Sequence, residues 1–252
     1  MKVLYGTSLH DQIVMGELHF YHRPSYNVLC FSKKKPEEEE KRYLSARKSS
    51  ILGLMNFYHR AATEVGEENA SIFTIHAMLL EDEDFDHRIR VMLYEQNATA
   101  EYAVRTVGAQ VAESFEGMAS EYLRARAMDI RDITRRMELR LLHTTTPKRL
   151  SHQATILVAE SFLPSEIMEL DRRRLLGMIS TKGSVTSHAA QLLQAYHIPT
   201  FGEVDIDPMW EGRLALMDGF AHRIYLDPDE EVQEILRLRY QEGGKPMHLG
   251  VC

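Results

Sequence analysis

The chain has 252 residues, enough for one or two domains, and 30 Lys and Arg against 37 Asp and Glu give a net charge of −7. This acidic balance argues against a nucleic-acid partner, and 44% hydrophobic with 27% charged residues is typical of a folded chain. Two cysteines, Cys30 and Cys252, are too few for a disulfide framework or a thiolate zinc site, which excludes those classes.

The N-terminal segment is predicted to form strands and the segment after it helices. Residues 2–21 hold apolar runs broken by Gly6 and Gly16, which favours one or two short strands around a turn whose pairing partners lie elsewhere. A first helix is expected over 37–65, because Pro36 and the glutamates after it suit a helix N-terminus. We expect Gly66 to end or kink this helix.

The helical pattern continues without proline to Leu142. Residues 71–93 are expected to form a helical region that Asp82–Asp84 could break in two, and apolar side chains recur every three or four residues over 103–115 and 122–141. Four or so helices joined by short links predict an antiparallel bundle that forms its own domain.

Strands and helices alternate after residue 154. The apolar runs at 155–159, 177–180 and 199–203 favour strands, and the stretches 165–175 and 187–195 between them favour helices. Two further strands, 214–217 and 223–226, flank a turn at Asp218-Gly219, and a helix over 229–240 is stopped by the Gly and Pro of 243–246.

This order predicts an α/β domain with an inserted helical bundle, although the bundle could instead simply precede the sheet. We place the α/β domain at 1–32 plus 144–230, the bundle at 33–143, and a C-terminal linker helix and tail at 231–252.

His188 is the histidine with the most suggestive surroundings. A strand, a turn at Gly183 and hydroxyls at Ser184, Thr186 and Ser187 precede it, and a helix follows it. Backbone donors at a helix start stabilise anions, and a neutral imidazole is nucleophilic near pH 7, so His188 could accept a phosphoryl group. The alternative is a structural histidine beside an ordinary helix cap.

The segment Gly183–Ala190, with Ile198-Pro199 following, resembles the phosphohistidine signature of Enzyme I of the phosphoenolpyruvate-dependent sugar phosphotransferase system. His76–Asp84 and Tyr122–Ile133 resemble two further motifs in the carrier-binding helices of that family, and Pro164-Ser165-Glu166 extends the similarity. Nearly the whole chain resembles the N-terminal half of the family. The resemblance implies an α/β phosphohistidine (swivelling) domain with an inserted helical carrier-binding bundle.

The resemblance also implies a reaction. His188 would carry a phosphoryl group and exchange it reversibly with the phosphocarrier HPr during sugar uptake, with hydroxyls from Thr186 and Ser187 nearby. Arg126 matches the family arginine near the transferred group and is the expected charge stabiliser, the alternative being a solvated helix arginine. Magnesium and phosphoenolpyruvate are expected only with the C-terminal barrel of the family, which this chain does not include, and no metal site is expected here.

Charge suggests where the carrier docks. Eight acids and no Lys or Arg lie between Glu64 and Asp86, a stretch that would steer a basic partner, although such runs are usually only solvated faces. Met78, Leu79 and Phe85 would give the surface an apolar centre, or they are core positions of the bundle. The expected partner-binding residues are Glu67, Glu68, His76, Met78, Leu79, Asp82, Glu83, Asp84, Phe85 and Leu123.

Two positions depart from the family pattern. Leu163 stands where the family has a threonine that hydrogen-bonds the active imidazole, and Gln194 stands where it has an arginine. These changes leave a competing hypothesis, a divergent protein that binds the carrier and regulates without transferring a phosphoryl group. A swivelling domain of a pyruvate phosphate dikinase relative is disfavoured by the carrier-binding motifs. No membrane-length apolar run and no signal segment occur, so we expect a cytoplasmic chain, monomeric as it stands.

Overall fold

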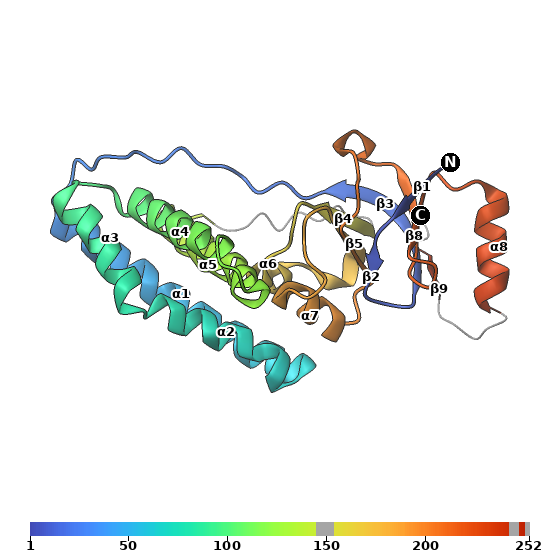
Figure 1. Ribbon diagram of the computed structural model, residues 1–252, viewed down its shortest axis with the longest axis horizontal. Helices are drawn as coiled ribbons and strands as arrows, with labels where there is room; N and C mark the ends of the chain where they lie inside the picture. The colour runs from blue at the N-terminus through green and yellow to red at the C-terminus, as the bar shows by residue number, and fades with distance from the viewer. Residues whose placement is uncertain (145–153, 242–246, 250–252) are drawn as a thin grey trace. The chain divides into compact units, whose positions relative to one another are not determined.

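The computed structural model describes residues 1–144, 154–241 and 247–249, and the chain divides into two compact units (Figure 1). The α/β unit comprises 1–23, 148–162 and 169–252, and the helical unit comprises 24–147 and 163–168. The chain therefore leaves the α/β unit, builds the helical unit and returns. This is the predicted arrangement of a sheet domain with an inserted bundle.

The first boundary lies earlier in the chain than the sequence suggested. Residues 24–32 belong to the helical unit because arginines of the bundle bind their carbonyl groups. Arg135 donates to the carbonyl of Pro24 at 2.6 Å, and Arg105 donates to that of Tyr26 at 3.0 Å. An extended segment without apolar periodicity gives no sign of these contacts in the sequence.

Two later segments also differ from the expected division. Residues 163–168 join the helical unit, where the backbone N–H of Ser165 donates to Asp132 at 2.9 Å. The helix expected to form a separate C-terminal linker belongs instead to the α/β unit, because Leu236 is buried against Ile13 and Leu216 of the sheet.

Six helices lie wholly or largely in the described helical unit. They are α1 (Pro36–Val65), α2 (Glu67–Leu80), α3 (Glu83–Glu95), α4 (Ala100–Glu116), α5 (Glu121–Leu141) and the short α6 (Pro164–Glu169). The predicted starts and stops hold: Pro36 opens α1, and Gly66 separates α1 from α2 with φ +91°, a conformation that glycine adopts without strain. Asp82 divides α2 from α3 by capping α3, since its carboxylate accepts from the N–H of Phe85 at 2.9 Å.

Apolar positions at helical spacing form the core of the bundle. The largest fully buried side chains there are Tyr43, Leu54, Phe73, Leu80, Ile89, Leu93, Ile133 and Met137. At roughly 2 kcal/mol of hydrophobic stabilisation for each such side chain, this core outweighs the weak intrinsic stability of single helices. This packed core holds the backbones of α2 and α5, and therefore their polar side chains, in fixed positions.

The α/β unit contains a nine-stranded mixed sheet among its described residues. Its strands are β1 (Lys2–Tyr5), β2 (Thr7–Ser8), β3 (Ile13–Phe20), β4 (Thr155–Ala159), β5 (Leu175–Ser180), β6 (Thr200–Gly202), β7 (Leu214–Asp218), β8 (Arg223–Leu226) and β9 (Met247–Leu249). The order is β1-β8-β7-β3-β4-β5-β6-β2, and β9 pairs with β3. Central strand β3 runs parallel to β4 and antiparallel to β7, so the N-terminal strands do find their partners far along the chain.

Alternation along β3 divides its side chains between the two faces of the sheet. Val14 and Leu18 join one buried cluster with residues of β4 to β8, whereas Ile13 faces the other way. Helix α8 (Glu230–Gln241) covers that second face through Leu236. Both faces are therefore buried, as expected for a largely parallel sheet centre.

One local prediction is wrong and another is confirmed. The helix expected over 165–175 ends at Glu169, and a 3₁₀ turn (Arg172–Arg174) leads directly into β5. The two strands predicted around Asp218-Gly219 do form an antiparallel pair joined by a turn, in which the buried carboxylate of Asp218 accepts from the N–H groups of Phe220 and Ala221, both at 3.1 Å. The Gly and Pro of 243–246 lie outside the described residues.

Candidate functional site

His188 is the first residue of α7 (His188–Ala195), where the sequence pattern placed it. Ser187 precedes it as the N-cap, with extended backbone angles and a hydroxyl that accepts from the N–H of Ala190 at 3.2 Å. Ala189 and Ala190 bury the adjoining helix face, while His188 itself is partly exposed. The imidazole therefore sits on a fixed backbone and remains accessible to a reactant.

The turn before His188 is held by its own hydroxyl groups. The Ser184 and Thr186 hydroxyls lie 2.8 Å apart, and the Ser184 hydroxyl also accepts from the N–H of Thr186 at 3.2 Å. The N–H of Ser187 donates to the Ser184 carbonyl at 3.2 Å. Thr186 is exposed and keeps hydrogen-bonding capacity, whereas the Ser187 hydroxyl is engaged as the helix cap.

Close packing against β6 fixes the same turn. A Cβ atom at Gly202 would lie 2.7 Å from Cγ1 of Val185 and 3.1 Å from the carbonyl oxygen of Gly183. Any larger residue at position 202 would thus push the turn outward. His188 is the first residue of its helix, and at a helix N-terminus backbone N–H groups and the helix dipole favour a bound anion.

Arg126 lies on α5 in the helical unit and is held by two neighbours. One amino group donates to Oδ2 of Asp129 at 3.2 Å, the other bonds the hydroxyl of Tyr122, and the guanidinium stacks 4.7 Å from the centroid of that ring. Burial opposes the charge, but these two hydrogen bonds outweigh it and raise the pKa of Arg126. The side chain is 16% exposed, so a permanently charged guanidinium is fixed yet reachable.

A buried charge cluster lies beneath Arg126. His76 of α2 is fully buried, with Nε2 at 3.2 Å from Oδ1 of Asp129 and Nδ1 at 3.6 Å from Oδ2 of Asp132. These are ion-pair distances, although neither ring nitrogen has the alignment of a hydrogen bond. Asp132 also accepts from the N–H of Ser165, so the cluster joins α2, α5 and the start of α6.

Asp132 gives the helical unit a predictable pH dependence. Burial raises the pKa of Asp132 from 3.8 to about 6, with His76 and the Ser165 N–H acting in the opposite direction. The folded state therefore holds a proton that the unfolded state releases, and this stabilisation is full below pH 3.8 and lost as the pH rises through 6. Between pH 4 and pH 7 the wild type should lose about 2 kcal/mol of unfolding free energy relative to Asp132→Asn.

Urea unfolding of both proteins across this pH range measures the difference. Asparagine retains an acceptor for Ser165 but does not titrate, so other ionisable groups cancel in the comparison. Parallel curves for the two proteins would rule out a raised pKa at Asp132.

The expected partner-binding residues fall into exposed and buried groups. Glu67, Glu68, Met78, Asp82, Glu83 and Asp84 are exposed, Leu123 is 36% exposed and Leu79 is partly buried. His76 and Phe85 are buried and lie beneath the surface rather than on it. Helical periodicity explains why His76 and Phe85 are buried, because each of them falls on the core side of its helix.

The acidic stretch is neither continuous nor wholly unpaired. Glu68 and Asp82 stand at opposite ends of α2, about 20 Å apart at 1.5 Å per residue, so the acids form two clusters. Asp86 is neutralised by Arg47 of α1 and by Arg90, to which its Oδ2 is bonded at 2.6 Å. The sequence run showed no cation because one of these arginines comes from another helix and the other lies just beyond the run.

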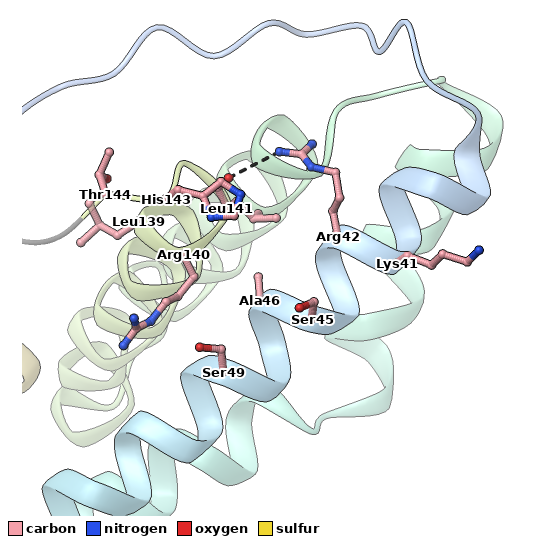
Figure 2. Close-up of a pocket in the computed structure, with 10 residues that line it drawn as sticks. All are labelled: Lys41, Arg42, Ser45, Ala46, Ser49, Leu139, Arg140, Leu141, His143 and Thr144. Carbon is pink, nitrogen blue, oxygen red and sulfur yellow. Dashed lines mark hydrogen bonds between the residues drawn. The ribbon is translucent and has the colours of Figure 1, made fainter.

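A cavity of about 610 Å³ lies between α1 and α5 in the helical unit and contains none of the predicted site residues (Figure 2). Its lining is Lys41, Arg42, Ser45, Ala46, Ser49, Leu139, Arg140, Leu141, His143 and Thr144. Arg42 is engaged by Glu39, Glu101 and the Leu141 carbonyl, and Lys41 extends away from α5 in Figure 2. Arg42 is therefore a lining cation whose charge is already compensated.

The structure describes both positions that depart from the family pattern. Leu163 is buried, and its backbone N–H donates to Oε2 of Glu166 at 3.0 Å, so its side chain supplies no hydrogen bond to a histidine. Gln194 lies on the exposed side of α7. Asp129 and Asp132 are site residues that the sequence pattern did not reveal, although Asp129 follows Arg126 at the i+3 spacing at which side chains on a helix surface meet.

Neither a metal site nor a membrane span is found in the described part of the chain. No cluster of three or more His, Cys, Asp or Glu side chains in residues 1–144, 154–241 and 247–249 is placed to hold a metal ion. None of the described helices is both long and apolar enough to cross a membrane.

Comparison with known proteins gives consistent matches. Residues 5–126 match the family model "PEP-utilising enzyme, N-terminal" and residues 151–220 match "PEP-utilising enzyme, mobile domain". A phosphoenolpyruvate-protein phosphotransferase of Priestia megaterium is 29% identical over 91% of this chain, and one of Lactococcus lactis subsp. lactis is 33% identical over 77%. The chain spans 41% and 35% of the lengths of these two relatives.

Two solved structures have a similar fold. The solution structure titled Enzyme I (nEIt) aligns with 96% of this chain and all of its own, with a TM-score of 0.70 and 26% identity. The N-terminal domain of Enzyme 1-Nitrogen aligns with 94% of this chain and 99% of its own, with a TM-score of 0.60 and 25% identity.

Proposed function

From the premise that the chain belongs to the PEP-utilising enzymes and has the fold of an Enzyme I N-terminal domain, we propose that it is the phosphoryl-carrying unit of a phosphoenolpyruvate-protein phosphotransferase. His188 accepts the phosphoryl group and exchanges it with a histidine of a small phosphocarrier of the HPr type. The observation that carries this proposal is the position of His188, partly exposed at the first residue of a helix capped by Ser187.

The proposed exchange is balanced without an added acid or base. The lone pair of Nε2 of His188 forms a P–N bond while the P–N bond to the histidine of the carrier breaks, and the released electron pair returns to the ring of the carrier. Because bond making and bond breaking occur in line, positioning and electrostatic stabilisation of the three equatorial oxygens account for most of the catalysis. In the α/β unit, backbone N–H groups of α7 and the Thr186 hydroxyl suit that role, and in the helical unit the guanidinium of Arg126 offers a fixed positive charge.

The test is to mix the chain with phosphorylated carrier at neutral pH and to record intact masses. A gain of one phosphoryl group that is lost on acidification is expected, because phosphohistidine is labile in acid. Binding of the carrier without this gain would instead support the non-catalytic docking protein, for which the apolar Leu163 is the favouring observation. Neither binding nor phosphoryl gain would contradict both functions.

The exposed acids at the turn from α2 to α3 should govern encounter with a carrier that has a basic face. We expect the triple change Glu81→Gln, Glu83→Gln and Asp84→Asn to raise the KM for the carrier about three- to tenfold and to weaken its salt dependence. Asp82 is left intact because it caps α3. Transfer kinetics at low and high salt measure the effect.

Glu113→Gln is the control for net charge, since it removes an exposed acid from α4 away from this turn. Its KM and salt dependence should match those of the wild type. A triple variant with an unchanged KM would place the docking surface elsewhere.

A further inference from the structure

We propose that His76 is a positioning residue for Arg126 and acts through Asp129. The proposal rests on the function above, because Arg126 matters only where a phosphoryl group is transferred. It replaces the expectation that His76 contacts the carrier, since the ring of His76 is fully buried.

The geometry that carries the proposal is one carboxylate, that of Asp129, whose two oxygens face two different side chains. Oδ1 of Asp129 lies 3.2 Å from Nε2 of His76, and Oδ2 of the same group accepts from Arg126 at 3.2 Å. Asp129 is 2% exposed, so water cannot replace either contact. Moving the imidazole therefore moves the carboxylate, and with it the guanidinium.

The second carboxylate fixes the ring itself. Asp132 faces the opposite edge of the imidazole, with its Oδ2 at 3.6 Å from Nδ1 of His76, and is held by the Ser165 N–H. Phe73, one turn earlier on α2, packs edge-on against the ring, with the centroids 6.4 Å apart and an interplanar angle of 85°. Side chains of α2 and α5 therefore fix the orientation of the His76 ring. A ring with a fixed orientation can in turn determine where the Asp129 carboxylate lies.

The shape of the side chain explains why position 76 holds a histidine. The imidazole places one ring nitrogen toward Asp129 and the other toward Asp132, on opposite edges of a rigid ring. Glutamine can reach only one of them with the same geometry. The change His76→Gln should therefore release Asp129 and leave Arg126 tethered by Tyr122, whose side chain is 66% exposed.

The first measurement does not depend on activity. NMR signals of the Arg126 side-chain Nε–H report rotation about the guanidinium bond, which hydrogen bonding restricts. In His76→Gln we expect this signal to broaden or to show fast rotation. Leu93→Ala, which removes a buried side chain from α3 outside the cluster, is the matched control for lost stability and should leave the Arg126 signal unchanged.

The second measurement is kinetic. His76→Gln should lower kcat for phosphoryl transfer by about tenfold or more and leave the KM for the carrier within about twofold, because a misplaced group weakens only the transition state. Asp129→Asn should reproduce both effects, and the double variant should be no worse than the more impaired single one. Should His76→Gln not fold, the isosteric Asp129→Asn takes its place in both measurements.

An Arg126 signal that is unchanged in the folded variants would overturn the proposal, as would the same change in Leu93→Ala. An effect on KM alone would also overturn it, because it would assign His76 to carrier docking. Absence of phosphoryl transfer in the wild type would contradict the proposed function, whereas the NMR comparison would still decide whether His76 positions Arg126.

Discussion

Replacement of His188 by alanine is expected to abolish the gain of a phosphoryl group from the phosphorylated carrier. No other nucleophile in the turn can substitute, because the hydroxyl of Ser187 is engaged as the helix cap and serine is a weak nucleophile without an adjacent base. The cap itself remains in the variant, so α7 and the fold should persist. Intact mass at neutral pH measures the loss, and circular dichroism verifies the fold.

His22→Ala is the matched control, since His22 is exposed and belongs to the same α/β unit. This variant should gain one phosphoryl group as the wild type does. A folded His188→Ala protein that still forms an acid-labile phosphoprotein would remove His188 from the proposed reaction and require another histidine in its place.

Replacement of Arg126 by alanine is expected to slow transfer by about 10² to 10³ without preventing the protein from folding. A fixed guanidinium that meets developing charge on a transferred phosphoryl group contributes effects of this size. Arg126→Lys should recover part of the rate, because the ammonium keeps the charge but cannot form the paired contacts to Asp129 and Tyr122. Rapid-quench measurement of phosphoryl exchange with the carrier provides the rates.

Arg131→Ala serves as the control on the same helix. Arg131 pairs with Glu116 at the surface, where an ion pair contributes little, so its rate should equal that of the wild type. An Arg126→Ala variant with an unchanged rate would return Arg126 to the alternative of a solvated helix arginine.

Much of this fold could be predicted because local signals agree with the final structure. The helices of the bundle were visible from apolar spacing, from Pro36 and from Gly66, and each of these acts within one or two turns. The same holds for His188, whose capping serine and preceding strand are close in sequence. The parts of the site that depend on contacts between residues close in sequence were therefore predictable.

Interactions between distant segments could not be predicted in this way. Nothing near Asp86 shows that Arg47 of α1 would neutralise it, and nothing near His76 shows that two carboxylates of α5 would enclose its ring. The start of α6 shows the same dependence, since the backbone N–H of Ser165 donates to Asp132 of a different helix. Such contacts depend on packing, which periodicity does not specify.

The insertion of the bundle into the sheet also determines the order in which the chain can acquire structure during synthesis. The helical segment 24–147 is continuous, so its local contacts can form as it leaves the ribosome. Strand β3 instead pairs with β4 and β7, which are synthesised much later. Lys2 of β1 likewise pairs with Leu226, near the other end of the chain. The earliest strands to be synthesised are therefore among the last to be paired, and their edges stay unpaired while the whole helical segment is synthesised.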